Sequence, residues 1–509
     1  MFLRCLLALA SLTPALLAQI TPMDVQFAGL SARTRLRAYR ENGGDLTPIT
    51  PLMADAANSD RTKAYRSLTH ALVVMTGKPW TPDAELPTAL DFSIGAKVVG
   101  LGEPLVTRAT FLFDAPAAAQ PPYRLRFDLM ADAGKLEAAL DHDIVLGDVR
   151  GRRAGDTIGV VLSPEIARLG QHILRATLED GHGTKLFEYY RTFSVVPELN
   201  KRVEALQKTL ELLPDQRQTA ALTIRQVLET IDTAHHTYFG TGFQNLAGYI
   251  YTGMRASGLG LKEPLDFDGE LRRATRLGEL LEAHKDPFAT ATGDLRMAYR
   301  STFDGKLVPY RVYLPTKYDP SRKYPLIVLL HGAGGDESDF LEGYAGQFPK
   351  LAEEHGYILA SVSGRGPVTG YAKANGSEQD VIDVMDFVKN RYSVDPARIY
   401  LGGHSMGGGG TWRVGGVYAD RFAGLIPIAG TSTAVLAGLD TLVKRKLPVM
   451  MVCGEKDALV AVAGCREVAD KAKAANAPVT YKEYAAGDHL SVVAMAAPDI
   501  FSWLDQQKR

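Results

Sequence analysis

Apolar runs that alternate with helix-length segments fill the chain after about Gly293. The runs are PLIVLLHG, YILASVSG, ARIYLGGHS, FAGLIPIAG, LPVMMVCGEKD and VTYKEYAAGDH. Continuous apolar strands joined by helices are typical of a parallel sheet that is covered on both faces. Before them, RMAYRSTFDGKLVPYRVYLP predicts a hairpin that turns at Asp304 and Gly305. The pattern therefore predicts an α/β domain over residues 293–509, built on a mostly parallel sheet of about eight strands.

At 509 residues the whole chain is too long for one core, because single cores seldom exceed about 250 to 300 residues. Residues 19–88 lack strand alternation and are expected to form a helical N-terminal segment. Short alternating runs separated by turns over 89–197 predict a β-sandwich-like domain. Leucines at helical spacing over 198–292 predict a helical connector ahead of the α/β domain.

The first residues have the pattern of a secretory signal peptide. Arg4 precedes an apolar run that ends in small residues near Ala18, where a signal peptidase could cut. The run is shorter than the roughly 20 apolar residues that span a bilayer, and Pro14 interrupts it. We expect cleavage of residues 1–18, a secreted or periplasmic location, and no membrane span in the mature chain.

The charge balance argues against a nucleic-acid partner. Lys and Arg number 57 against 58 Asp and Glu, and no basic run is long enough to follow a phosphate backbone. The 46% apolar and 23% charged composition is that of an ordinary folded protein. We therefore expect the whole mature chain to fold.

Two cysteines, Cys453 and Cys465, remain once the signal peptide is removed. A single pair does not make a disulfide framework, although one bridge could form. The favoured interpretation is that Cys453 is an unpaired buried strand residue and Cys465 a small apolar helix residue.

The segment Gly403 to Gly407, with the sequence GHSMG, follows the apolar strand RIYL and precedes a segment that can become helical. A nucleophilic serine on such a tight strand-to-helix turn needs residues without side chains two positions before and two positions after it. The alternative is a plain structural turn. The position between a buried strand and a glycine-rich helix start favours Ser405 as a nucleophile.

A serine hydroxyl needs a base to take its proton and an acid to orient that base. Asp457 stands just past the strand LPVMMVCGEK, and His489 follows the last strand. Glu455 is the nearest rival acid and is expected to face solvent, while Asp488 is expected to be a turn residue. The order Ser, Asp, His is that of the α/β-hydrolase fold.

A glycine-rich bend, His331 to Gly335, follows the strand PLIVLL. Acyl transfer places negative charge on the carbonyl oxygen, so two backbone N–H groups must face that point. We assign them to Ala333, with Gly332 as the alternative, and to Met406. A dinucleotide loop is excluded because its third glycine would fall on Glu337. No cofactor and no metal are expected.

Three further sequence features near Ser405 are the glycine run 407–410, Trp412 and the stretch 363–380. The glycine run 407–410 indicates close helix packing, since no Lys-Ser or Lys-Thr follows it as in a phosphate loop. Trp412 is expected in the core rather than against a substrate. The stretch SGRGPVTGYAKANGSEQD, residues 363–380, is expected to form one wall of the substrate pocket.

The segment from about Tyr310 to Trp503 resembles the secreted esterase branch of the α/β-hydrolase superfamily. That branch includes polyhydroxybutyrate-depolymerase-like, feruloyl and acetylxylan esterases, with dienelactone hydrolases and prolyl-oligopeptidase catalytic domains more distant. The matching stretches are PYRVYLP, YPLIVLLHGAGGDESDF, SVDPARIYLGGHSMGGGGTW and GEKDALV, followed by GDH. The resemblance implies the fold and a catalytic triad of Ser405, Asp457 and His489.

The expected activity is that of a serine carboxylesterase that forms an acyl-enzyme on Ser405, with a small-molecule or polymer-borne ester as substrate. A serine peptidase of the prolyl-oligopeptidase type is the first alternative. Those peptidases usually have an aromatic residue where Met406 stands and a propeller that is not visible here. The second alternative is a secreted binding protein with a degenerate hydrolase domain.

Overall fold

A computed structural model describes most of the chain, namely residues 20, 22–119, 122–130, 136–162, 168–213, 215, 218–236, 265–366, 368–431 and 434–507. The predicted signal peptide, residues 1–18, lies outside these. Within the described part, no helix combines the length and the apolar character needed to cross a membrane. The chain divides into two compact units, Met1–Glu204 with Glu229–Gly253 and Pro264–Leu271, and Ala205–Leu228 with Met254–Glu263 and Arg272–Arg509.

The second unit is built on an eight-stranded sheet in the order β16-β15-β14-β13-β11-β12-β10-β9. The strands are β9 Gly293–Arg300, β10 Leu307–Leu314, β11 Tyr324–Leu330, β12 Ile358–Val362, β13 Val394–His404, β14 Gly424–Ile428, β15 Val449–Gly454 and β16 Val479–Tyr484. The predicted hairpin is confirmed, since β9 pairs antiparallel with β10. From β12 to β16 every neighbouring pair is parallel. The predicted mostly parallel sheet of about eight strands is therefore confirmed.

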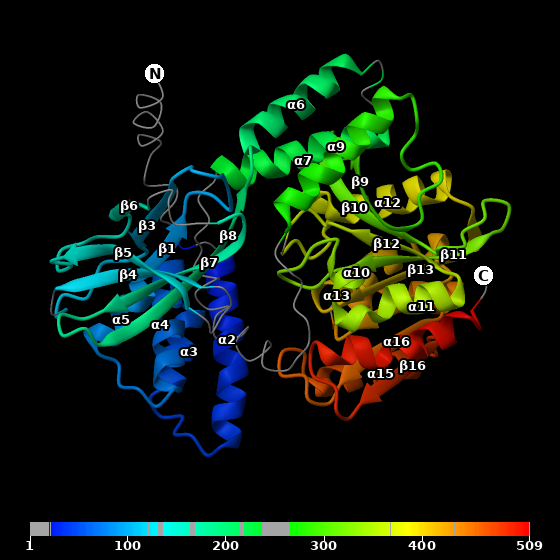
Figure 1. Cartoon of the computed structure of the whole chain (residues 1–509). Coiled ribbons are helices and arrows are strands. Elements are labelled where there is room, and N and C mark those ends of the chain that lie inside the picture. Colours follow the sequence, from blue (N-terminus) through cyan, green and yellow to red (C-terminus); the bar gives the residue numbers. More distant parts are fainter. Residues whose placement is uncertain are drawn as a thin grey trace. The chain divides into compact units, whose positions relative to one another are not determined.

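Helices follow the parallel strands as the sequence predicted. They are α10 Asp339–Glu342, α11 Gln347–His355, α12 Ser377–Arg391, α13 Met406–Val417, α14 Ala434–Arg445, α15 Val462–Ala474 and α16 Ser491–Leu504. Side chains of α11 and α16 share one buried cluster with alternate residues of the strands, Met450 and Val452 of β15 among them. Because side chains alternate along a strand, Met451 and Cys453 face the other side of the sheet. Figure 1 shows these helices around the sheet.

The first unit has a helical beginning and two sheets. Its helices are α2 Pro22–Glu41, α3 Thr50–Ala57, α4 Arg61–Val74 and α5 Pro82–Ala89. Its strands are β1 Leu90–Ile94, β2 Val98–Gly100, β3 Leu105–Phe111, β4 Tyr123–Met130, β5 Leu136–Gly147, β6 Thr157–Leu162, β7 Gly170–Glu179 and β8 Lys185–Val196. The sheets β1-β3-β6 and β2-β8-β7-β4-β5 share a buried cluster that contains Phe92, Phe111 and Phe127. Two sheets over one core match the predicted β-sandwich-like architecture.

Three long helices correspond to the predicted helical connector, α6 Leu199–Leu212, α7 Thr219–His236 and α9 Phe267–Glu282. Leu206, Leu210 and Ile231 are buried, as their helical spacing predicted. In the second unit, Thr223 Oγ1 accepts a hydrogen bond from the backbone N–H of Ala298 on β9, at 3.1 Å. The boundaries proposed for the connector and the other domains stay predictions.

Candidate active site

Ser405 lies on the turn between β13 and α13, at the carboxyl end of the sheet. Its backbone has φ 55° and ψ −114°, a conformation that non-glycine residues rarely adopt. Its N–H donates to the carbonyl oxygen of Ile428 at the end of β14, at 2.8 Å. This backbone bond ties the turn to the neighbouring strand and helps to hold Ser405 in an unfavourable region.

Gly403 and Gly407, two positions before and after Ser405, must be glycines because neighbouring backbone atoms leave no room for a side chain. A Cβ atom on Gly403 would lie 2.4 Å from the carbonyl oxygen of Gly407, and one on Gly407 would lie 2.0 Å from the carbonyl oxygen of Leu330. Both distances are far below van der Waals contact with backbone atoms that cannot move aside. The sequence GHSMG is therefore needed for the local geometry, as the tight turn predicted.

The structure brings Ser405, His489 and Asp457 together, although they are far apart in sequence. His489 Nε2 lies 2.9 Å from Ser405 Oγ, and His489 Nδ1 lies 2.7 Å from Asp457 Oδ2. An ionised carboxylate only accepts, so Nδ1 carries the proton and Nε2 accepts from the serine hydroxyl. Asp457 is 1% exposed, and its Oδ1 accepts the N–H groups of Leu459 and Val460 at 2.8 Å each.

The loops that carry Asp457 and His489 are joined directly by their backbones. The N–H of Glu455 donates to the carbonyl of Tyr484, and that of Lys456 donates to the carbonyl of Gly487. Gly454 permits the contact, because a Cβ atom there would lie 2.3 Å from the carbonyl oxygen of Gly487. The two loops therefore form one packed junction at the ends of β15 and β16.

The rival acids stand where the sequence placed them. The Glu455 side chain is 44% exposed. The Asp488 carboxylate accepts from the N–H groups of Leu490 and Ser491, which makes it a turn residue. The carboxylate that hydrogen-bonds the imidazole of His489 is that of Asp457.

His404, the residue before Ser405 on the turn, lies beside His489. Its Nε2 donates to the carbonyl oxygen of His489 at 2.7 Å, and its Nδ1 accepts from the hydroxyl of Tyr344 at 2.9 Å. Burial, with the neighbouring His489, holds the pKa of His404 well below its usual range. A neutral ring matches this pattern of one donor and one acceptor. Sequence reasoning missed Tyr344, which no motif marks.

The residues assigned to the oxyanion hole lie on the two segments that meet at Ser405. Met406 is the first residue of α13, so its N–H has no partner within the helix. A Cβ atom on Gly332 would lie 3.5 Å from the Cβ of Ser405, which brings the 331–335 bend against the serine. The roles of Ala333, Gly332 and Met406 stay predictions.

The stretch 363–380 reaches the residue next to the serine. The N–H of Gly370 lies 3.4 Å from Met406 Sδ. The buried Tyr371 donates its hydroxyl to the carbonyl of His331 at 3.3 Å, and its ring fills the space that a side chain at Gly410 would need. Such contacts agree with a pocket wall, which remains a prediction.

Arg365 anchors this stretch to two other elements. Its guanidinium donates to Asp380 on α12 and to Asp304 in the β9–β10 turn, at 2.7 Å each, and it also contacts Ser301. The Asp380 side chain is fully buried, so its charge needs this partner. The start of the predicted pocket wall is therefore fixed by a buried ion pair.

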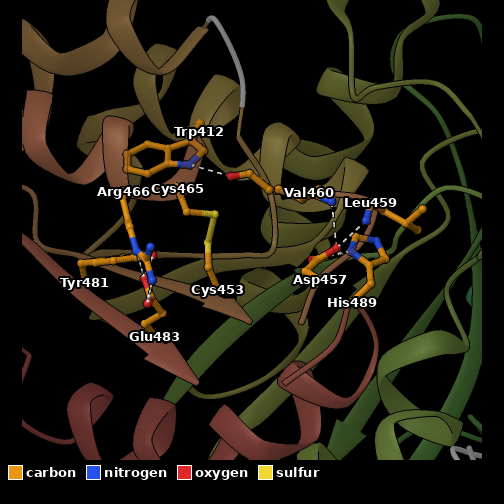
Figure 2. Close-up of a disulfide and its surroundings, with 11 residues drawn as sticks. Trp412, Cys453, Asp457, Leu459, Val460, Cys465, Arg466, Tyr481, Glu483 and His489 are labelled. Carbon is orange, nitrogen blue, oxygen red and sulfur yellow. Dashed lines mark hydrogen bonds and ion pairs between the residues drawn. A yellow bond between two sulfur atoms is a disulfide. The ribbon is translucent and has the colours of Figure 1, made fainter. Parts of the chain in front are cut away.

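The expectation of unpaired cysteines is wrong. Cys453 and Cys465 form a disulfide. Cys453 faces the side of the sheet opposite α16, and Cys465 stands in the first turn of α15, so the strand and helix phases bring both side chains together (Figure 2). The predicted burial of Cys453 on a strand and the predicted helical position of Cys465 are confirmed, and the two residues are 1% and 0% exposed.

The interpretations of Trp412 and of the glycine run 407–410 are confirmed. Trp412 is buried, and its indole N–H donates to the carbonyl of Gly430 at 3.2 Å (Figure 2). A Cβ atom on Gly408 would lie 2.8 Å from the Cα of Gly430, so the glycine run allows α13 to pack closely. In the described part of the chain, no group of three or more His, Cys, Asp or Glu is arranged to hold a metal ion.

Residues 327–446 match the sequence model of the Alpha/beta hydrolase family. The match covers the strands β11 to β14 and the turn that carries Ser405. The second unit has the α/β-hydrolase fold. Its sheet order, its helices on both faces and its strand-end serine are those of this fold.

The α/β-hydrolase domain is also similar to curated enzymes over short stretches. It is 32% identical over 135 residues to a poly(3-hydroxybutyrate) depolymerase of Ralstonia pickettii, covering 23% of this chain and 28% of the relative. It is 27% identical over 139 residues to feruloyl esterase B of Thermothelomyces thermophilus, covering 26% and 46%.

A third relative belongs to a different enzyme class. A probable dipeptidyl-aminopeptidase B of Sclerotinia sclerotiorum is 25% identical over 203 residues, covering 35% of this chain and 20% of the relative. The matches span less than half the length of each of these three proteins.

Proposed function

We propose that this chain is a serine ester hydrolase in which Ser405 is the nucleophile, His489 the general base and Asp457 the acid that orients it. One observation carries the proposal: an unbroken line of hydrogen bonds from Ser405 Oγ through both nitrogens of His489 to a buried carboxylate. A hydroxyl in such a line loses its proton to the ring as it attacks a carbonyl carbon.

The proposed reaction runs in two halves. Ser405 Oγ attacks the ester carbonyl while His489 Nε2 takes its proton, and the alcohol leaves with that proton, so that an acyl-enzyme remains. Water, deprotonated by His489, then attacks the acyl carbonyl and releases the acid. The N–H groups of Met406 and of Ala333 or Gly332 would stabilise the oxyanion in each half. The reaction needs no metal or organic cofactor.

The ester class rests on similarity. The depolymerase and feruloyl esterase relatives favour a carboxylic ester, on a small molecule or a polymer, over an amide. The pattern of residues 1–18 favours export, so we propose a secreted or periplasmic enzyme. The triad itself supports only acyl transfer, and the fold does not select the substrate, because one fold supports many functions.

The decisive test is turnover of p-nitrophenyl esters by the purified chain and by Ser405→Ala. We expect kcat to fall by a factor of about 10⁴ to 10⁶ while the circular dichroism spectrum stays unchanged. Ser502→Ala, an exposed serine on α16, is the matched control and should keep full activity. Retained turnover in Ser405→Ala would overturn the assignment.

Similarity to a dipeptidyl-aminopeptidase favours a peptidase as the second candidate. Parallel assays with aryl esters and prolyl amides separate the two, and faster cleavage of the amides would reverse our order. A fluorophosphonate probe tests the remaining alternative, a binding protein with an inactive domain. Failure of the folded protein to react at Ser405 would favour that alternative.

A further inference from the structure

The Cys453–Cys465 disulfide closes the loop that carries Asp457. Cys453 is the next-to-last residue of β15, Asp457 follows it by four positions, and Cys465 lies in the first turn of α15. The two sulfur atoms therefore join the strand before the loop to the helix after it. Figure 2 shows this bond and, at the far end of the same short loop, the Asp457 carboxylate against His489.

We propose that this disulfide is a positioning element for the catalytic acid, which keeps Asp457 in line with His489. This inference rests on the proposed function and deepens it. It assigns to Cys453 and Cys465 a role in the reaction through Asp457, without contact to the substrate.

Apart from the disulfide, few buried side chains fix the start of α15 on the sheet. Its N-cap residue, Ala461, provides no side-chain hydrogen bond to the first turn. In the whole helix, the buried residues are Cys465 and Ala472. Val462 and Val468 are half-buried. Because burial of apolar surface normally fixes a helix on a sheet, the covalent bond adds a constraint to a helix with little fully buried surface.

Most of the loop is exposed, Leu459 and Val460 are half-buried, and the acid is buried. Glu455, Lys456, Ala458 and Ala461 are exposed, whereas Asp457 is buried. The Asp457 carboxylate is oriented by the N–H groups of Leu459 and Val460, which lie between it and α15. A shift of the helix start would therefore displace two of the donors that aim the carboxylate at His489.

One further contact joins the same elements. Arg466, next to Cys465, donates to Glu483 of β16 at 2.9 Å, and Glu483 is the register partner of Cys453. The Arg466 guanidinium, the largest influence, lowers the pKa of Glu483 to about 2. The Arg466 side chain is 54% exposed, and exposed ion pairs contribute little. Substitution of Arg466 is therefore a matched control, because it removes a weaker contact between the same helix and the neighbouring strand β16.

The first test compares Cys453→Ala/Cys465→Ala with Arg466→Met on a p-nitrophenyl ester, at a temperature well below unfolding. A catalytic group displaced by about 1 Å can lose about 100-fold in rate. We expect the double cysteine variant to lose 10- to 100-fold in kcat with KM unchanged within about twofold. Arg466→Met should stay within about twofold of the parent in both.

A double-mutant cycle asks whether the effect acts through the acid. In an Asp457→Asn background the orienting carboxylate is already gone, so removal of the disulfide should change kcat by less than about twofold. An equal loss with and without Asp457 would overturn the inference, because the bond would then act elsewhere.

If the double cysteine variant does not fold, chemical reduction of the disulfide in the parent protein tests the same inference. A water-soluble phosphine converts the disulfide to two thiols and is itself oxidised to the phosphine oxide. The rate of Ser405 labelling by a fluorophosphonate should fall at least tenfold and return on reoxidation. An unchanged rate in protein with two titratable thiols would overturn the inference. Failure of the oxidised protein to label would instead overturn the proposed function.

Discussion

Asp457 Oδ2 lies 2.7 Å from His489 Nδ1, while its other oxygen accepts the N–H groups of Leu459 and Val460. The carboxylate is thus held through both of its oxygen atoms. With both oxygens engaged, its direction is set before a substrate arrives. The tautomer of His489, and hence the ability of Nε2 to accept the serine proton, depends on this one contact.

Asp457→Asn should therefore lower kcat by a factor of about 10² to 10⁴ with little change in KM, since an amide would favour the wrong tautomer of His489. Steady-state kinetics on an aryl ester measures the effect. Glu455→Gln, two residues away and exposed, is the control and should keep the parent rate. Equal losses in both variants would mean that Asp457 is not the acid.

Gly407→Ala should destabilise the domain by about 3 kcal/mol or prevent its folding, because the new methyl would lie 2.0 Å from the carbonyl oxygen of Leu330. Gly464→Ala is the control within α15, where a Cβ atom meets nothing within 4 Å. It should stabilise the protein by about 0.5 to 1 kcal/mol. Urea denaturation measures both, and a stable Gly407→Ala protein would contradict the packing described.

Acid should destabilise the protein through His404. The pKa of this buried ring is far below its usual value, so the folded state binds no proton there when the unfolded state does. Stability from this group is complete above about pH 6.5 and falls by up to about 1.4 kcal/mol for each pH unit below it. His404→Gln has no titratable ring, so its stability should fall less steeply between pH 6.5 and 5. Parallel slopes in urea titrations would contradict this.

Arg365→Met should cost about 3 kcal/mol in the free energy of unfolding, because it leaves the buried Asp380 carboxylate without its charged partner. Lys306→Met is the matched control, since Lys306 also lies near Asp304, at 3.8 Å, but is 79% exposed. Exposed pairs contribute little, so this variant should unfold like the parent. Similar losses in the two variants would contradict a special role for the buried pair.

The sheet and the grouping of Ser405, Asp457 and His489 were predictable because each residue follows an apolar strand, and parallel strands end at one edge. The disulfide was not predictable in the same way. The disulfide depends on which face of the sheet Cys453 points to and which side of α15 Cys465 lies on. A shift of either cysteine by one residue would turn its side chain away from the other. The contact of Tyr344 with His404 was also out of reach, since it joins residues 60 positions apart without a motif.

The contact between Gly454 and Gly487 limits where the substrate preference of the proposed esterase could be changed. Because backbone meets backbone there, an insertion in either the acid loop or the base loop would separate Asp457 from His489. Substrate preference must therefore be altered elsewhere. Residues 368–376 are the natural place, because they reach Met406 without crossing that junction.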